Sequence, residues 1–443
     1  MLERIGIPAR LLPHLVLGWA VTWFAVMALH GGSSWHYFVQ GASALADADD
    51  PVSGGLHVYA AAPVLQIGPL TFLAVLPLLP AGTAAALLGW QVLGAAAGLL
   101  VLWLTRGLVP AEARDDGFLV VAAGSFMPIW MFLAVGVTHV DDVLALLLSV
   151  AALCAARSGR AALAGLLLGL AADAKPWAVG FAALLLLLPG WRRRLLAAAV
   201  VAATVAAAWL PFFAADSGTG DAVRFTIQNA PVSALHALGV HDARTPAWDR
   251  PAQLVLALAL GAVAVHRGRW AAIPLLAVAS RLVLEPGGNK YYLAGILVGT
   301  VIWDWAGSRA TLPWWTMSSC FGLFVSRFVP MPDRLHGWLL VVFFAAVCTL
   351  LLGPRRDGGQ RAAGPRPVAR SCRRCTATRP AQAGGVYAGR LAATRCCPKL
   401  KTFGSRASTV ALTQWFWASP KVVTLVKFST TFGPARPAAF VVA

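Results

Sequence analysis

Apolar segments long enough to cross a lipid bilayer recur along most of this chain, and they constrain its fold more than any other feature. A transmembrane helix needs about 20 mainly apolar residues, and one water-soluble core cannot bury many such segments. Because backbone polar groups inside a bilayer must be satisfied internally, the pattern predicts an all-α polytopic transmembrane bundle with about twelve crossings. The predicted crossings are 11–30, 83–104, 117–137, 141–156, 161–174, 176–189, 195–215, 251–266, 270–284, 291–306, 311–327 and 337–353.

Composition and charge separate the chain into two parts. Hydrophobic residues make up 58% of it and charged residues 12%, whereas soluble domains average about 25% charged. The net charge is +18, but residues 355–443 hold 16 Lys and Arg with one acid. We therefore predict a transmembrane domain over residues 1–354 and a basic, Cys-containing, disordered cytoplasmic tail over 355–443. The basicity belongs to the tail, so we predict no nucleic-acid partner, and its cysteines lack the spacing of a metal site.

Two apolar segments near the N-terminus need separate interpretation. The first follows Arg4 and Arg10 without an obvious small-residue cleavage site, so we predict a retained helix rather than a signal peptide. Residues 64–80 contain Pro69, Pro77 and Pro80. Because proline interrupts helices, we interpret this stretch as re-entrant or interfacial helices in the first outer loop.

The arginines between the apolar segments predict the orientation. Short cytoplasmic loops are enriched in Lys and Arg, so the N-terminus and the tail are expected in the cytoplasm of a multi-pass plasma-membrane protein. The remaining polar segments hold most of the acids and histidines, and they would then face the extracytoplasmic side. These segments are 31–63, 138–142, 173–177, 216–250, 285–290 and 328–336.

The segment between the third and fourth crossings has the most informative side chains. It contains His139, Asp141 and Asp142. Two carboxylates beside an imidazole can bind a divalent cation, orient a hydroxyl group or transfer a proton. The same carboxylates can cap a helix N-terminus and interact favourably with its dipole, and the two roles are compatible.

Lys175 lies between two crossings that are short. Segments 161–174 and 176–189 have 14 residues each, and at ~1.5 Å per residue each spans about 21 Å of a core about 30 Å thick. The junction should therefore be recessed. An ammonium at that depth needs a partner or an anionic ligand, so Lys175 either binds an anion, pairs with Asp173 or extends to the interface.

Two further outer segments carry candidate binding residues. In the first outer loop, aromatic and titratable side chains suit a sugar-binding or proton-accepting surface, although residues 47–51 also fit a solvated turn. Near the end of the ninth crossing, Arg281 lies at a depth suited to an interfacial phosphate, or it forms an i,i+4 salt bridge with Glu285. The candidates in these two segments are His36, Asp49, Asp50, His57, Tyr59, Gln66, Arg281, Lys290 and Tyr291.

Taken together, these residues give the chain a resemblance to the GT-C superfamily of polytopic glycosyltransferases. It resembles most the actinobacterial polyprenyl-phosphate-mannose-dependent mannosyltransferases and their uncharacterised relatives, over roughly residues 10–353. The matching passages are Ser34-Trp-His-Tyr-Phe-Val-Gln-Gly-Ala42, Gly55-Leu-His-Val-Tyr59, Gln66-Ile-Gly-Pro-Leu70, His139-Val-Asp-Asp142, Gly169-Leu-Ala-Ala-Asp-Ala-Lys-Pro-Trp177 and Asn289-Lys-Tyr-Tyr292.

The resemblance implies a transferase that uses no cofactor. It would move a sugar, mannose by the resemblance, from a polyprenyl-phosphate carrier to a glycolipid or glycan acceptor outside the membrane. Asp49 or Asp50 would be the base, and Lys175 and Arg281 would stabilise the leaving phosphate. Relatives place an acid soon after the first helix, where this chain has serines and a histidine. Asp141 or Asp142, beside His139, is therefore the alternative base. The implied substrate-binding residues are His36, His57, Tyr59, Gln66, Lys175, Trp177, Arg281, Lys290 and Tyr291.

Two other classes of function remain open from the sequence. A transporter or flippase also uses recessed charges and short helices, although no inverted repeat is evident. A non-catalytic membrane scaffold would be favoured if the outer histidines and carboxylates proved to be dispersed in space. No P-loop, H-E-x-x-H motif or dinucleotide-binding fingerprint is present, which disfavours a nucleotide-driven reaction.

Overall fold

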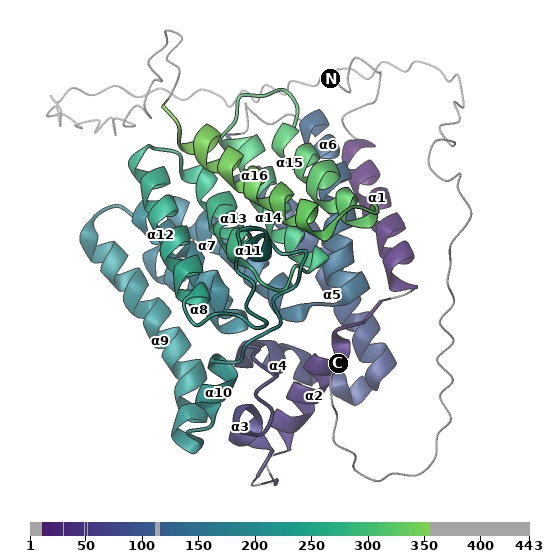
Figure 1. Cartoon of the computed structure of the whole chain (residues 1–443), viewed down its shortest axis with the longest axis vertical. Coiled ribbons are helices and arrows are strands. Elements are labelled where there is room, and N and C mark those ends of the chain that lie inside the picture. The colour runs from purple at the N-terminus through teal and green to yellow at the C-terminus, as the bar shows by residue number, and fades with distance from the viewer. Residues whose placement is uncertain (1–10, 30, 48, 51, 111–115, 355–443) are drawn as a thin grey trace, which may run out of the picture. The chain divides into compact units, whose positions relative to one another are not determined.

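The computed structural model describes residues 11–29, 31–47, 49–50, 52–110 and 116–354, and these residues form an all-α fold. Long helices run beside one another in a bundle, and several short helices gather at its lower end in the view of Figure 1. The all-α prediction is confirmed. The predicted tail, 355–443, lies outside the described residues.

Most predicted crossings correspond to a single helix. The boundaries agree to within a few residues, as expected for segments that are recognised by their apolar length. These helices are α1 (Leu12–Ala28), α5 (Thr83–Gly107), α6 (Asp116–Met131), α7 (Val140–Arg157), α8 (Ala161–Ala174), α9 (Trp191–Ala215), α12 (Asp249–His266), α13 (Ile273–Leu284), α14 (Leu293–Ala306) and α16 (Asp333–Leu352).

Four helical segments among the described residues are long and apolar enough to cross a membrane: Thr83–Gly107, Gly117–Val137, Trp191–Ala215 and Asp333–Leu352. Shorter apolar helices accompany them, so the fold is compatible with a multi-pass membrane protein. In α9, only 11% of the apolar window is buried. This helix lies at one edge of the bundle in Figure 1 and presents the kind of surface that lipid would cover.

The sixth predicted crossing differs from the expected α-helix. Residues Pro176–Leu187 form a 3₁₀ helix, η7, directly after α8. Lys175 is extended, with φ −149° and ψ 115°, because a residue that precedes proline is sterically disfavoured in the α conformation. A 3₁₀ helix rises ~2.0 Å per residue, so this segment is stretched relative to an α-helix of equal length.

Irregular helical turns also interrupt two other crossings. After α6, the π-helix η6 (Phe132–Val137) ends at Thr138, which has the left-handed φ of 58° that β-branched residues rarely adopt. The Thr138 hydroxyl donates to the carbonyl of Val135 at 2.8 Å and helps to hold this turn. The crossing predicted at 311–327 is divided into α15 (Trp314–Ser318), η10 (Ser319–Phe324) and η11 (Val325–Phe328).

The segment between α1 and α5, predicted to be the first outer loop and so named below, contains only short helices among its described residues. The proline-rich segment forms α4 (Pro69–Val75) and, directly after it, the 3₁₀ helix η4 (Leu76–Ala81). Its interpretation as re-entrant or interfacial helices stays a prediction. The other elements near it are α2 (Trp35–Ala46), η3 (Gly55–His57), α3 (Val58–Ala61) and α10 (Thr219–Val223). Helices α2, α3, α4 and α10 lie at the lower end of the bundle in Figure 1.

The start of α4 is attached to the end of α8. The backbone N–H of Gly68 donates to the carbonyl of Ala174 at 3.3 Å. The backbone N–H of Leu70 donates to the Asp173 carboxylate at 3.0 Å, and the Thr71 hydroxyl donates to Ala174 at 3.3 Å. The first outer loop is therefore held directly beside Lys175.

Replacing Gly68 with alanine should strongly destabilise this contact. An added Cβ would lie 1.2 Å from the carbonyl oxygen of Asp173, and backbone cannot move aside as a flexible side chain can. We expect Gly68→Ala to lower stability by about 2–3 kcal/mol or more, measured as the midpoint of thermal unfolding in detergent. Gly124→Ala is the matched control, because a Cβ there meets nothing within 4 Å. Equal midpoints for the two variants would contradict the close packing.

Candidate functional site

A cavity of about 610 Å³ lies among the first outer loop, α7, the α8–η7 junction, α12 and α13. Its wall contains charged, amide and aromatic side chains, which is typical of a small-molecule site. The charged and titratable residues on the wall are Tyr37, His139, Asp141, Lys175, Asp249, Arg250, Arg281, Glu285, Tyr291 and Tyr292.

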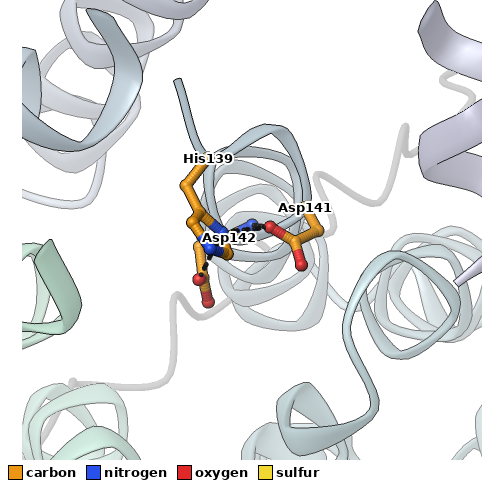
Figure 2. Close-up of side chains that lie close together, drawn as sticks. All are labelled: His139, Asp141 and Asp142. Carbon is orange, nitrogen blue, oxygen red and sulfur yellow. Dashed lines mark hydrogen bonds and ion pairs between the residues drawn. The ribbon is translucent and has the colours of Figure 1, made fainter. Parts of the chain in front are cut away.

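His139, Asp141 and Asp142 converge at the start of α7 (Figure 2). His139 is the N-cap residue, and the two carboxylates lie in the first turn rather than at the cap. Nδ1 of His139 contacts both carboxylates, at 3.0 Å for Asp142, and the backbone N–H of Asp142 donates to Asp141 at 2.8 Å. Negative charge in a first turn interacts favourably with the helix dipole, so the helix-terminus role and a site role coexist.

Lys175 pairs with these carboxylates across the α7–α8 interface. Its Nζ contacts Asp141 and lies 3.8 Å from Oδ2 of Asp142. The predicted alternative of a pair with Asp173 is wrong, because that carboxylate lies in the last turn of α8 and accepts from Leu70 instead. Lys175 lies beyond the helix end in extended backbone, which separates it from Asp173.

Arg281 joins the same cluster from α13. Its Nη1 lies 3.4 Å from Oδ1 of Asp142, and its Nε lies 3.3 Å from Oε2 of Glu285. The predicted salt bridge with Glu285 is therefore present, together with a contact to the aspartate pair. The guanidinium also lies 4.4 Å from the ring centre of Trp177 and 4.1 Å from that of Tyr292.

The cluster holds one more carboxylate than permanent cation, so its charge balances only when His139 is protonated. It contains the carboxylates of Asp141, Asp142 and Glu285 and the cations of Lys175 and Arg281, and His139 adds a positive charge only when protonated. The side chain of Lys175 is 16% exposed and that of Asp141 fully buried. Because buried charges are stable only when paired, loss of either partner leaves an unfavourable charge. An anion that entered the cavity would compete with the carboxylates for both cations.

The same residues could hold a metal ion. Ligand atoms of His139, Asp141 and Asp142 all lie within 4.8 Å of one another. This set of one imidazole and two carboxylates suits a divalent cation. The Lys175 ammonium already contacts Asp141, so a metal would have to displace it or bind beside it.

The carboxylates of the first outer loop lie elsewhere. Neither Asp49 nor Asp50 lines the cavity, and Asp49 is exposed. The Asp50 carboxylate accepts from the Ser53 hydroxyl and from the backbone N–H groups of Val52 and Ser53. The Ser53 hydroxyl, followed by these backbone groups, lowers the pKa of Asp50. The arrangement is the solvated turn that the sequence allowed.

Three predicted binding residues of the first outer loop do not themselves line the cavity. His36 is exposed and packs against Tyr37 at 3.9 Å between ring centres. His57 Nδ1 lies 3.1 Å from Oδ2 of Asp216, and this hydrogen bond lowers the pKa of that carboxyl. Tyr59 is fully buried and donates to the Ile67 carbonyl at 2.6 Å, which indicates a packing role.

The remaining predicted binding residues divide between the wall and its surroundings. Gln66, Trp177 and Tyr291 line the cavity, whereas Lys290 does not. Trp177 donates from Nε1 to Asp142 at 3.0 Å, and Tyr291 stacks on His139 at 4.3 Å between ring centres. Lys290 instead lies 4.3 Å from the ring centre of Phe328.

Sequence reasoning missed several wall residues at the start of α12 and one within α9. Asp249, Arg250 and Gln253 line the cavity, as does Trp209. The available signal was an acid immediately before an apolar segment on the predicted outer side. That signal is weak for Asp249, because this residue lies far along the sequence from the other candidates.

Comparison with known proteins does not assign the chain to a protein family. No protein family, no curated protein and no solved structure matches the chain. The fold and site define an all-α protein with long apolar helices and a buried charge cluster on the wall of a cavity.

Proposed function

We propose that this chain is a multi-pass membrane glycosyltransferase of the GT-C type. It would move a sugar from a polyprenyl-phosphate carrier to an acceptor hydroxyl on the extracytoplasmic side. One observation carries the proposal: Lys175 and Arg281, from segments far apart in sequence, meet the same aspartate pair on the wall of a cavity of about 610 Å³. This pattern argues against a scaffold with dispersed charges.

The two cations support a phosphate-binding role. Guanidinium and ammonium groups form charge-assisted hydrogen bonds to phosphate oxygens, and such bonds strengthen where water is excluded. The donor phosphate carries negative charge when bound and gains more as the sugar leaves. Fixed cations at this position stabilise the leaving group in the transition state.

The carboxylate–imidazole pair supplies a route for the proton. The acceptor oxygen attacks the anomeric carbon, the bond from that carbon to the phosphate oxygen breaks, and its electron pair leaves with the lipid phosphate. The acceptor proton passes to Asp141 or to Nε2 of His139, whose Nδ1 faces the carboxylates. When the phosphate attracts Lys175, the Asp141 oxygen that contacted the ammonium becomes available as a base.

A transporter is the second candidate, and the irregular helices at the site favour it. The extended Lys175 and the 3₁₀ helix η7 interrupt the apolar segments beside the charge cluster, and broken helices often form transporter binding sites. Transfer and transport make different predictions. A transferase forms a new glycoside, whereas a transporter moves its ligand unchanged.

The direct test is transfer from a radiolabelled polyprenyl-phosphate sugar in membranes that contain this protein. We expect label to move into a hydroxyl-bearing acceptor and free polyprenyl phosphate to form in equal amount. Membranes with the Asp141→Asn variant, expressed at the same level, are the control. Release of unchanged donor on the other side of sealed vesicles, without a new glycoside, would support the transporter instead.

A further inference from the structure

Asp249 is a buried carboxylate on the cavity wall outside the charge cluster. It lies in the first turn of α12 and has no exposed surface. Its Oδ2 accepts from Nε2 of Gln253 at 2.8 Å. Its Oδ1 is also buried and has no hydrogen-bond partner among the described residues. An unpaired buried acceptor is unfavourable, so the fold alone does not account for this oxygen.

A second buried aspartate shows what a purely structural role looks like. Asp304 accepts from the backbone N–H of Trp315 at 3.3 Å through one oxygen. Its other oxygen accepts from the backbone and hydroxyl of Thr316 at 2.8 and 2.9 Å. Both oxygens are therefore used to hold α15. Asp249 differs, because its Oδ1 has no hydrogen-bond partner among the described residues although the residue lines the cavity.

The neighbours of Asp249 favour a hydroxylated ligand over an anion. Gln253 also donates to the carbonyl of Leu284 at 3.3 Å, next to Glu285, so two carboxylates lie at this part of the wall. The neighbouring cations are already engaged, because Arg250 donates to Gln66 and to the carbonyls of Val223 and Phe225, and Arg281 pairs with Glu285. Neutral hydrogen-bonding side chains of Gln66, Thr245 and Asn289 line the same cavity. Amides and hydroxyls orient hydroxyl groups without requiring a charge on the ligand.

We propose that Oδ1 of Asp249 accepts a hydrogen bond from a hydroxyl group of a sugar, in a subsite beside the phosphate-binding cations. The subsite rests on the proposed function in one respect, which is that the bound sugar is taken to be the acceptor of the transfer reaction. The ion pair between Glu285 and Arg281 links the two subsites, since Glu285 adjoins Leu284 and Arg281 reaches Asp142. The acceptor hydroxyls and the donor phosphate would thus occupy neighbouring parts of one cavity.

The test measures binding of methyl α-mannopyranoside and its mono-deoxy analogues to the full chain in lipid nanodiscs, without donor. We expect one analogue to bind the unmodified protein roughly tenfold more weakly or worse. Asp249→Asn should bind methyl α-mannopyranoside more weakly by a similar factor. The variant's affinity for that analogue should be no lower than its affinity for the parent sugar. Asp304→Asn is the control variant, and it should retain the full dependence on that hydroxyl.

Thermal unfolding supplies the second readout. In Asp249→Asn, the new amide oxygen can still accept from Gln253, and a neutral NH2 group takes the place of the unpaired charged oxygen, which makes burial of this position less costly. The midpoint should therefore be retained or raised, whereas Asp304→Asn should lower it. Equal affinity of all analogues for the unmodified protein would overturn the subsite. The subsite would also be overturned if Asp249→Asn lowered the unfolding midpoint and left sugar binding unchanged. Because no donor is present, failure of glycosyl transfer would leave this result intact.

Discussion

Replacing Lys175 with methionine should reduce donor binding and sugar transfer by a factor on the order of 10² or more. Methionine retains most of the apolar stem but removes the ammonium that would contact the donor phosphate. Binding is measured with a radiolabelled polyprenyl-phosphate sugar, and transfer is measured in the same membranes. Undiminished binding and turnover would exclude the phosphate role and leave Lys175 as a structural partner of Asp141.

Controls must separate the loss of a ligand contact from the loss of folding. Lys175→Met leaves Asp141 without its ammonium partner, and breaking a buried pair in this way costs about 3–5 kcal/mol. The double variant Lys175→Met/Asp141→Asn removes both charges, so thermal stability should largely recover while donor binding stays weak. Arg193→Met is the matched control for charge loss, because Arg193 is exposed at the start of α9.

Asp141→Asn should have a different signature, with transfer lost and donor binding retained. General base catalysis contributes roughly 10²–10⁴ in rate, and transfer should fall within that range whether Asp141 takes the proton or orients His139. Donor affinity should change less than about tenfold, because Lys175 and Arg281 remain. Single-turnover transfer at saturating donor makes the distinction. A fall in donor affinity that accounts for all of the lost transfer would contradict a role in proton transfer.

The helices of this fold were predictable because apolar length is a local property of the sequence. The boundaries of α7 and α8 follow from uninterrupted apolar runs that end in charged residues. The prolines of residues 64–80 likewise indicated that this stretch does not form one long crossing helix, and the structure has the short α4 followed by η4 there. The 3₁₀ conformation of η7 was missed, because its composition alone does not distinguish it from an α-helix.

The partners of the charged residues were less predictable, since they depend on packing between distant segments. The sequence favoured His139, Asp141 and Lys175 as site residues, and the fold brings these three together. It did not indicate that Lys175 would contact Asp141 instead of Asp173, because proximity along the chain suggested the wrong pair. Asp249 entered the site only through the packing of α12 against α13, which no local pattern encodes.

The junction after α8 has a consequence for finding relatives of this chain. Within a few residues, Asp173 holds the first outer loop, Lys175 contacts Asp141, and Trp177 donates to Asp142. These positions are tied to two other segments, α4 and the first turn of α7, so a substitution at one of them requires a compensating change far away in the sequence. We therefore expect Asp173, Lys175 and Trp177 to be retained in homologues, while the residues of the apolar helices vary. A search for D-x-K-P-W preceded by H-x-D-D, with a glycine before the proline of α4, should therefore recognise distant homologues that overall similarity misses.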